Sequence, residues 1–135
     1  MKKIGMLILS LAMFLGFIVC NAQTSKVLEN TKSTSKVEAY YFHFSSRCVT
    51  CKTVESEAKA NIESLYGGKV RFTAINLDDD SSKALAEKLK VSGQSLLLVK
   101  GDSKINITNE GFMYARSNPE KFKSIIKEKV DGLLK

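Results

Sequence analysis

Apolar residues are grouped along the chain in a pattern that predicts alternating strands and helices. Residues 37–44 and 70–77 are dense in aromatic and β-branched side chains without a turn residue, which is typical of strands in a buried parallel sheet. Residues 95–99 predict a third strand, and the Gly101-Asp102-Ser103 turn returns the chain as a fourth strand over 104–108. A helix between the first two strands makes that pair parallel, whereas the hairpin makes the last pair antiparallel.

Three further segments repeat apolar residues at helical spacing. The first begins near Cys48 and ends at about Tyr66, where Gly67-Gly68 stops it. Its inward positions recur at spacings of four, four and three residues: Val54, Ala58, Ile62 and Leu65. The second helix is expected over residues 81–91. The third follows Asn118-Pro119, which supplies an N-cap and a proline at the first helical position.

The polar stretches between these elements are interpreted as caps and loops. We expect the triplet Asp78-Asp79-Asp80 to cap the second helix and to interact favourably with its dipole. A calcium loop is the alternative, but the triplet lacks the turn Gly and the closing Glu of an EF-hand. Residues 109–117 are expected to form a loop. On the first strand, Tyr40, Tyr41 and Phe44 are expected in the core.

The first residues have the layout of a secretory signal peptide. Lysines precede an apolar run over 4–19, and the small residues Cys20 and Ala22 follow, so we expect residues 1–22 to be removed by cleavage after Ala22. The run is short for a bilayer span, which takes about 20 residues. Lipidation of Cys20 is the alternative, but Phe17-Ile18-Val19 lacks the small residue expected before a lipidated cysteine. The mature protein is expected in the periplasm or cell envelope.

The rest of the chain is expected to be a polar leader followed by one domain. Residues 23–36 are rich in Ser, Thr and Lys and predict a flexible leader, with a short edge strand at 26–29 as the alternative. Residues 37–135 suffice for a single core. Loss of Lys2 and Lys3 lowers the formal net charge from +7 to +5. Because no basic stripe with interleaved aromatics is present, nucleic-acid binding is not expected.

The stretch 40–57 carries the candidate chemistry, because it joins a strand, a Ser-Ser-Arg turn and a helix start that holds Cys48 and Cys51. Two cysteines three apart on a helix lie close enough to form a disulfide. The leading thiol meets backbone N–H groups without helical partners and the positive end of the helix dipole, and Arg47 adds a positive charge. Removal of Cys20 leaves an even pair in a compartment where disulfides form. Thiol redox chemistry is therefore favoured, with Cys48 as the nucleophile.

Other interpretations of these residues stay open. The pair is half of a zinc site in one of them, although the sequence has no second C-x-x-C and its only histidine is His43. It is a purely structural disulfide in another. We interpret His43 as a core histidine rather than a base or a ligand. Arg47 either lowers the pKa of the leading thiol or is a solvated charge.

The order strand, C-x-x-C helix, strand, helix, hairpin, helix resembles the thioredoxin fold. The resemblance covers residues 37–134 and rests on YYFHFSSRCVTCKTVE, VRFTAINLDDDSSKALAEKLKV and SGQSLLLVKGDSKI. It implies a trimmed α/β fold, in which a central mixed four-stranded sheet has helices on both faces. The amino-terminal strand and helix of full-length thioredoxins are missing, because only the polar leader precedes Val37.

The resemblance also implies roles for single residues. Cys48 matches the attacking thiol, Cys51 the resolving thiol, and Gln94-Ser95 the loop that faces the active site. Thioredoxins carry a cis-proline where Gln94 stands, and a cis peptide without proline costs about 2.5–4 kcal/mol, so we expect a trans Gly93–Gln94 peptide. Phe42 stands where thioredoxins keep a buried acid that accepts a proton from the resolving thiol. These departures favour a dedicated partner over general disulfide reduction.

Within this superfamily, FSSRCVTCK followed by VSGQSLL resembles a small exported bacterial family named for a nitrophenyl-compound nitroreductase subunit, the ArsF type. The resemblance implies a reductive system for aromatic nitro compounds or arsenicals, with a membrane thiol carrier as electron source. We expect a monomeric thiol-disulfide oxidoreductase without a cofactor besides the Cys48-Cys51 disulfide. Its inner-membrane partner is expected to dock near Arg47, Gln94 and Ser95. The alternative function is binding of a soft metal or a trivalent arsenical by Cys48 and Cys51.

Overall fold

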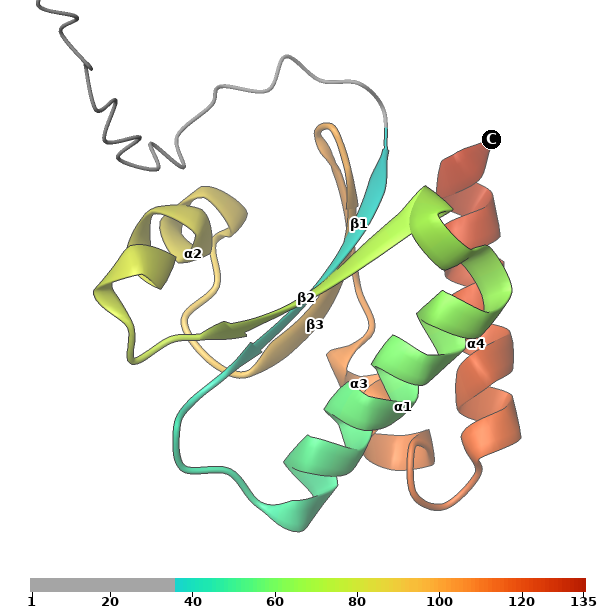
Figure 1. The fold of residues 1–135 in the computed structure, drawn as a ribbon, viewed down its shortest axis with the longest axis horizontal. Helices are drawn as coiled ribbons and strands as arrows, with labels where there is room; N and C mark the ends of the chain where they lie inside the picture. Colours follow the sequence, from blue (N-terminus) through green and yellow to red (C-terminus); the bar gives the residue numbers. More distant parts are fainter. Residues whose placement is uncertain (1–35) are drawn as a thin grey trace, which may run out of the picture. The chain divides into compact units, whose positions relative to one another are not determined.

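The protein folds around a four-stranded sheet, which the computed structural model describes within residues 36–135 (Figure 1). Its strands are β1 (Val37–His43), β2 (Val70–Asn76), β3 (Ser95–Lys100) and β4 (Ser103–Asn106). They lie in the order β2-β1-β3-β4. β1 is parallel to β2 and antiparallel to β3, and β3 is antiparallel to β4. The mixed four-stranded sheet expected from the sequence is confirmed.

The expected signal peptide and nearly all of the expected leader lie outside the described residues. This applies to the expected signal peptide over 1–22, with its Cys20 and Ala22, and to all of the 23–36 leader except Lys36. Both therefore stay predictions. Among residues 36–135, no helix is long and apolar enough to cross a membrane.

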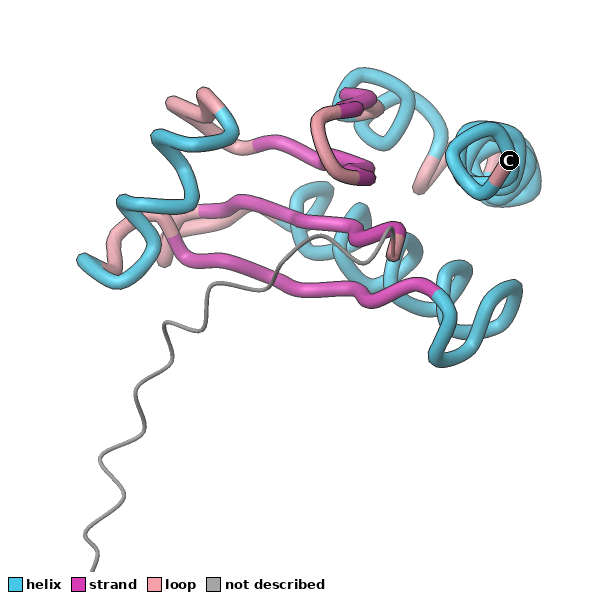
Figure 2. The backbone as a smooth tube through the Cα atoms, turned by 90° about the horizontal axis from the view of Figure 1, so that it is seen from above, coloured by secondary structure: helices cyan, strands magenta, loops and turns pink. Residues whose placement is uncertain are grey.

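Helices cover both faces of the sheet, as expected. α1 (Val49–Tyr66) and α4 (Pro119–Leu134) pack on one face, and α2 (Lys83–Leu89) packs on the other (Figure 2). The alternation of side chains along β1 explains how one strand serves both layers. Tyr41 joins the core under α1 and α4, whereas Phe42 joins the core under α2.

The larger core fixes α1 on the sheet. Its largest fully buried side chains come from β1, α1, β3, α4 and the residue that follows β4: Tyr41, Ile62, Leu96, Leu98, Ile107, Phe122 and Ile126. Burying one large apolar side chain contributes about 1.5–3 kcal/mol, so this layer holds the helix firmly. The smaller core contains Phe42, Ala86, Leu89 and Leu97. The N-terminus of α1 therefore has a fixed position relative to β1.

The predicted ends of two helices are confirmed. α1 ends at Tyr66, and Gly67 follows with φ 52°, a left-handed conformation that glycine adopts without strain. A short 3-10 helix, η1 (Gly67–Lys69), leads into β2. At the start of α4, the Asn118 side chain accepts a hydrogen bond from the backbone N–H of Lys121, and Pro119 takes the first helical position.

The segment expected to be a loop over 109–117 is largely helical, so that prediction is wrong. It contains α3 (Thr108–Tyr114), which packs against α1 and α4. The Thr108 hydroxyl anchors the helix by accepting a hydrogen bond from the Leu96 backbone N–H at 2.8 Å. A Cβ at Gly111 would lie 2.9 Å from Cγ1 of Val54. Glycine is therefore needed here for close packing, even though it lowers helix propensity.

Two other expectations are corrected by the structure. Phe44 lies outside the core, because its side chain is 40% exposed, beyond the end of β1. The aspartate triplet does not cap α2 through its side chains. Instead, Asp78 accepts a hydrogen bond from the Ser45 backbone N–H at 2.7 Å, and Asp80 forms an ion pair with Lys83. Asp80 also opens a 3-10 turn, η2 (Asp80–Ser82), ahead of α2.

Candidate functional site

Cys48 is the N-cap residue of α1, which is the position that the C-x-x-C pattern predicted for the leading thiol. Its backbone is extended, with φ −74° and ψ 167°, and its Sγ accepts a hydrogen bond from the Cys51 backbone N–H at 3.3 Å. Both cysteines are in the dithiol form; Cys48 is exposed, whereas Cys51 is only 6% exposed. The Cys48 thiol is therefore accessible to a partner, whereas the Cys51 thiol is protected from solvent.

Hydrogen bonds lower the pKa of Cys48 below that of an ordinary thiol. The largest cause is a hydrogen bond from the Cys51 side chain, followed by one from the Cys51 backbone N–H. The backbone N–H of Thr50 contributes in the same direction. These groups belong to the first turn of α1, where N–H groups have no helical acceptor. Because the thiolate is the nucleophile, this arrangement makes Cys48 the more reactive sulfur.

Arg47 forms an ion pair with another side chain rather than standing free beside the thiol. Its guanidinium hydrogen-bonds to the Glu55 carboxylate, and the two side chains are 21% and 24% exposed. Arg47 is not among the groups that lower the pKa of Cys48. The charge of Arg47 is therefore matched largely by Glu55, a residue that the sequence pattern did not single out.

Gln94 connects its loop to the resolving cysteine through a buried tyrosine. The Gln94 Nε2 donates a hydrogen bond to the Tyr41 hydroxyl at 2.5 Å, and that hydroxyl donates to the Cys51 carbonyl oxygen at 2.8 Å. No cis peptide bond occurs among residues 36–135, so the Gly93–Gln94 peptide is trans, as expected. Burial raises the pKa of Tyr41 to about 12. The hydroxyl therefore keeps its proton at neutral pH and remains a donor.

Tyr41 was expected in the core, and it is fully buried, but its role in this chain of hydrogen bonds was missed. A buried tyrosine usually finds a partner for its hydroxyl, which is the one signal in the sequence. Ser95 makes no comparable link, since its hydroxyl donates to the Gly93 carbonyl oxygen within the same loop at 3.0 Å.

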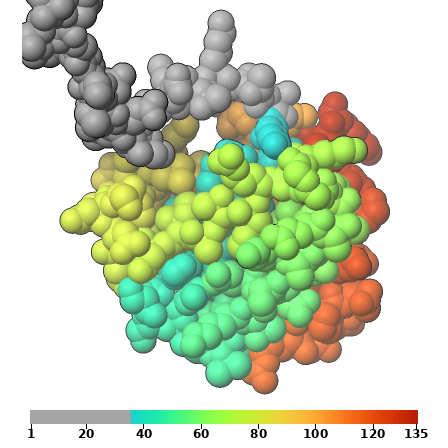
Figure 3. Space-filling view, in the orientation of Figure 1, coloured from blue at the N-terminus to red at the C-terminus, as the bar shows by residue number. Residues whose placement is uncertain are grey.

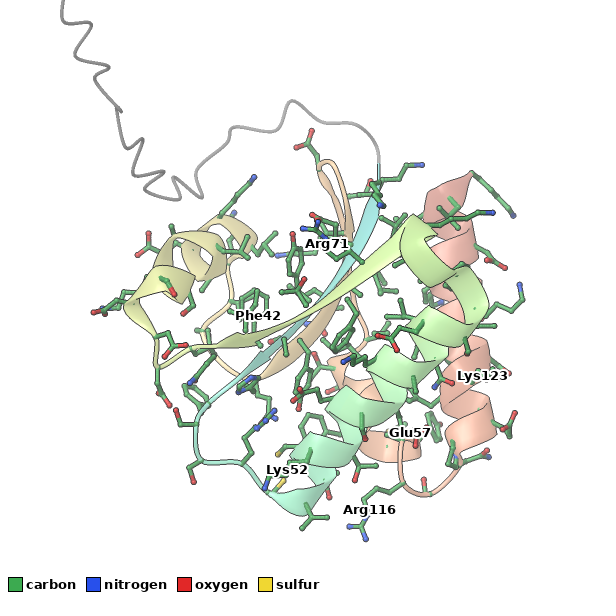
Figure 4. All side chains as sticks on the ribbon, viewed as in Figure 1. Phe42, Lys52, Glu57, Arg71, Arg116 and Lys123 are labelled. Carbon is green, nitrogen blue, oxygen red and sulfur yellow. The ribbon has the colours of Figure 1, made fainter. Side chains whose placement is uncertain are left out.

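The two residues that follow Tyr41 supply no acid to the cysteine pair. Phe42 is fully buried on the side of the sheet that faces α2 (Figure 4). His43 is only partly buried, and its Nδ1 lies 3.0 Å from the Phe44 carbonyl oxygen. The expectation that His43 belongs to the core is therefore wrong, and its ring is engaged beyond the end of the strand.

Residues from the far end of the chain lie beside the start of α1. Arg116, which follows α3, donates a hydrogen bond to the Thr50 hydroxyl at 3.4 Å. Figure 3 shows the surfaces of α1 and of the region from α3 to α4 meeting on one face. Val49, which follows Cys48 directly in the chain, is 69% exposed. The surface near Cys48 therefore combines an apolar side chain with a cation.

Within residues 36–135, no three His, Cys, Asp or Glu side chains are grouped so that they could hold a metal ion. The described part of the chain thus brings together two thiols, Cys48 and Cys51, without a third ligand of these types.

Comparisons with known proteins concern the fold. No family model matches the sequence, and no curated protein matches it either. Among solved structures, Trxlp from Edwardsiella tarda EIB202 matches with a TM-score of 0.51 and 17% identity, over 70% of this chain and 84% of Trxlp. Thioredoxin-2, a component of malaria parasite protein secretion machinery, matches with a TM-score of 0.43 and 23% identity, over 55% of this chain and 69% of its own.

The match to Trxlp extends over most of both chains. The resemblance to the nitroreductase-subunit family stays a prediction, because no family model matches. The sheet order β2-β1-β3-β4, the helices on both faces and the likeness to Trxlp identify the fold of this chain as thioredoxin-like.

Proposed function

We propose that this protein is a thiol-disulfide oxidoreductase that works through Cys48 and Cys51. The observation that carries the proposal is the geometry of the pair: an exposed thiol with a lowered pKa caps α1, and a buried thiol three residues later donates to it. Exposure and a stabilised thiolate are the properties of an attacking cysteine, whereas a protected neighbour suits the resolving step.

The reaction follows from these positions. The Cys48 thiolate attacks one sulfur of a partner disulfide, so that a mixed disulfide forms and the other partner sulfur leaves as a thiolate. Cys51 then loses its proton and attacks the Cys48 sulfur, which releases the second partner sulfur. The partner gains two electrons and two protons, and the protein ends as the Cys48-Cys51 disulfide. No additional cofactor takes part in these steps.

Trapping of a mixed disulfide tests the proposal. We expect Cys48→Ser to abolish thiol exchange and Cys51→Ser to accumulate the mixed disulfide, because only the capping thiol is placed to attack. The measurement is mass spectrometry of each variant after incubation with a disulfide-containing protein. Faster alkylation of Cys51 than of Cys48 by iodoacetamide in the reduced wild-type protein would reverse the assigned roles.

The cellular part of the proposal rests on the sequence. The signal-peptide pattern over residues 1–22 supports work in the periplasm or cell envelope, where cytosolic reductants have no access. The resemblance to the nitroreductase-subunit family supports a reducing role, with electrons from an inner-membrane thiol carrier that docks near Arg47, Gln94 and Ser95. Aromatic nitro compounds or arsenicals are the substrates that this resemblance suggests.

Binding of a soft metal or a trivalent arsenical by the same two thiols is the alternative function. Thiolates prefer soft ions, and the two sulfur atoms are already in hydrogen-bond contact. Titration of the reduced protein with Cu(I), Zn(II) and As(III) separates the two functions. Redox turnover that persists in the presence of a strong chelator, together with no tight complex, would exclude the alternative.

A further inference from the structure

The resolving step requires a base, and the sheet does not supply one at the expected place. Cys51 must lose its proton before it attacks the mixed disulfide, because the thiolate is the nucleophile. Phe42 occupies the position at which the resemblance to thioredoxins implies a buried acid, and its ring is buried against α2. The proton of Cys51 therefore has to go to a group outside the sheet.

Glu55 is placed to receive it. This residue lies four positions after Cys51 on α1, and side chains at that spacing share one face of a helix, with Cβ atoms about 5–6 Å apart. That distance allows transfer directly or through one water molecule. The Glu55 side chain is 24% exposed, and its ion pair with Arg47 holds it at the cysteine end of the helix.

The other polar groups around Cys51 are less suited to this role. Cys51, Glu55 and Arg47 influence the pKa of Tyr41, but the Tyr41 hydroxyl is already a donor to the Cys51 carbonyl oxygen and keeps its proton. Gln94 is not titratable.

Groups on the neighbouring segments are directed elsewhere. His43 is bound to the Phe44 carbonyl oxygen on the loop side. Arg116 donates a hydrogen bond to the Thr50 hydroxyl. Glu110 of α3 contributes to the raised pKa of Lys129 on α4.

We propose that Glu55 is the base that takes the proton from Cys51 in the resolving step, and that Arg47 is a positioning residue for it. This inference rests on the proposed function. In the step, the Cys51 proton moves to the Glu55 carboxylate while the Cys51 sulfur forms a bond to the Cys48 sulfur. The bond between Cys48 and the partner sulfur breaks, and the partner leaves as a thiolate with the electron pair.

Stopped-flow reaction of the reduced protein with dithiobis(nitrobenzoate) separates the two steps. Attack by Cys48 releases one coloured thiolate at a rate proportional to the reagent concentration. Attack by Cys51 on the mixed disulfide releases the second coloured thiolate at a rate independent of that concentration. The leaving group needs no proton, so the second phase reports deprotonation and attack by Cys51 alone.

We expect Glu55→Gln to slow the second phase at neutral pH by at least about 10²-fold, the usual contribution of a general base, and to leave the first phase unchanged. The rate of the residual second phase should rise tenfold per pH unit, because hydroxide then has to remove the proton. In the wild type, the dependence on hydroxide should be absent around neutral pH. Glutamine keeps a hydrogen-bond acceptor for Arg47, so the fold is retained.

Two further variants complete the test. Glu57→Gln is the matched control, since two residues along an α-helix correspond to a rotation of roughly 200°, so residue 57 lies on the opposite side of α1 from residue 55. Glu55→Asp keeps a carboxylate and should restore the flat pH profile with a reduced rate. A second phase that is as fast in Glu55→Gln as in Glu57→Gln would overturn the role of Glu55. A missing first phase in the wild type would instead refute the proposed function itself.

Discussion

At the scale of the residue, the reactivity of Cys48 depends mainly on its neighbour in the pair. The side chain of Cys51 is the largest cause of the lowered pKa of Cys48, whereas Arg47 is not among the causes. We therefore expect Cys51→Ala to raise the pKa of Cys48. The pH at which alkylation of Cys48 by iodoacetamide reaches half its maximal rate should move upward, because the thiolate loses its strongest donor.

Arg47→Gln is the control for this prediction, since its charge is matched by Glu55. It should leave the alkylation profile of Cys48 in place. An upward shift in Arg47→Gln as large as in Cys51→Ala would mean that a formal charge, and not a hydrogen bond, sets the reactivity of Cys48.

The residues of the site differ in how far the sequence identifies them. Cys48 and Cys51 are three apart at a helix start, so local spacing alone brings them together. Tyr41 and Gln94 are far apart in the chain and meet only because β1 lies beside β3 in the sheet. Glu55 was missed because its importance depends on the pairing with Arg47, which no periodic pattern reveals.

At the scale of the element, α3 shows where pattern reading fails. The helix is seven residues long and has a glycine in its middle, so neither its length nor its composition predicts a helix. Tertiary contacts stabilise this helix instead. Gly111 lets α3 pack closely against Val54 of α1 and Phe122 of α4. The long elements with clear periodicity were predicted correctly because local and tertiary preferences agree there.

We expect Gly111→Ala to destabilise the protein by about 1–3 kcal/mol in urea unfolding. The added methyl group would lie 2.9 Å from Cγ1 of Val54, and overpacking at such a contact outweighs the gain of up to about 1 kcal/mol in helix propensity.

Gly132→Ala in α4 is the matched control, because no atom lies within 4 Å of the added methyl group. It should stabilise the protein or leave it unchanged. If Gly111→Ala behaves in the same way, α3 does not pack closely on α1.

At the scale of the whole molecule, the order of elements determines where the cysteines lie. A parallel pair of strands joined by α1 places the start of that helix at the end of β1, and the antiparallel β3 brings Gln94 to the same edge. This topology was predictable because helix crossovers and hairpins leave few alternatives. The contacts on the surface around Cys48 were not, since they involve α3 and Arg116 from the far end of the chain.

Processing of the chain can be tested at this scale. If residues 1–22 are a cleaved signal peptide, the protein isolated from the cell envelope should begin at Gln23. N-terminal sequencing or intact mass measurement decides this. A mature protein that begins at a lipid-modified Cys20 would contradict cleavage after Ala22 and indicate a lipoprotein, and an intact N-terminus would indicate a retained anchor.

The direction of electron flow is the last property that belongs to the whole molecule. The hydrogen bonds that stabilise the Cys48 thiolate make the disulfide easier to reduce, so taken alone they favour an oxidant. The family resemblance favours a reductant, which in the envelope needs electrons delivered through the inner membrane.

We expect the protein to be found mainly as the dithiol when growing cells are quenched with acid and alkylated. It should shift to the disulfide when inner-membrane thiol carriers are deleted, because only continuous delivery of electrons keeps a readily oxidised pair reduced in that compartment. Wild-type protein that is fully reduced with dithiothreitol before alkylation provides the gel standard for the dithiol form. A protein found wholly as the disulfide, and unchanged by the deletions, would contradict the reducing role and assign the Cys48-Cys51 pair to oxidation or to a structural bridge.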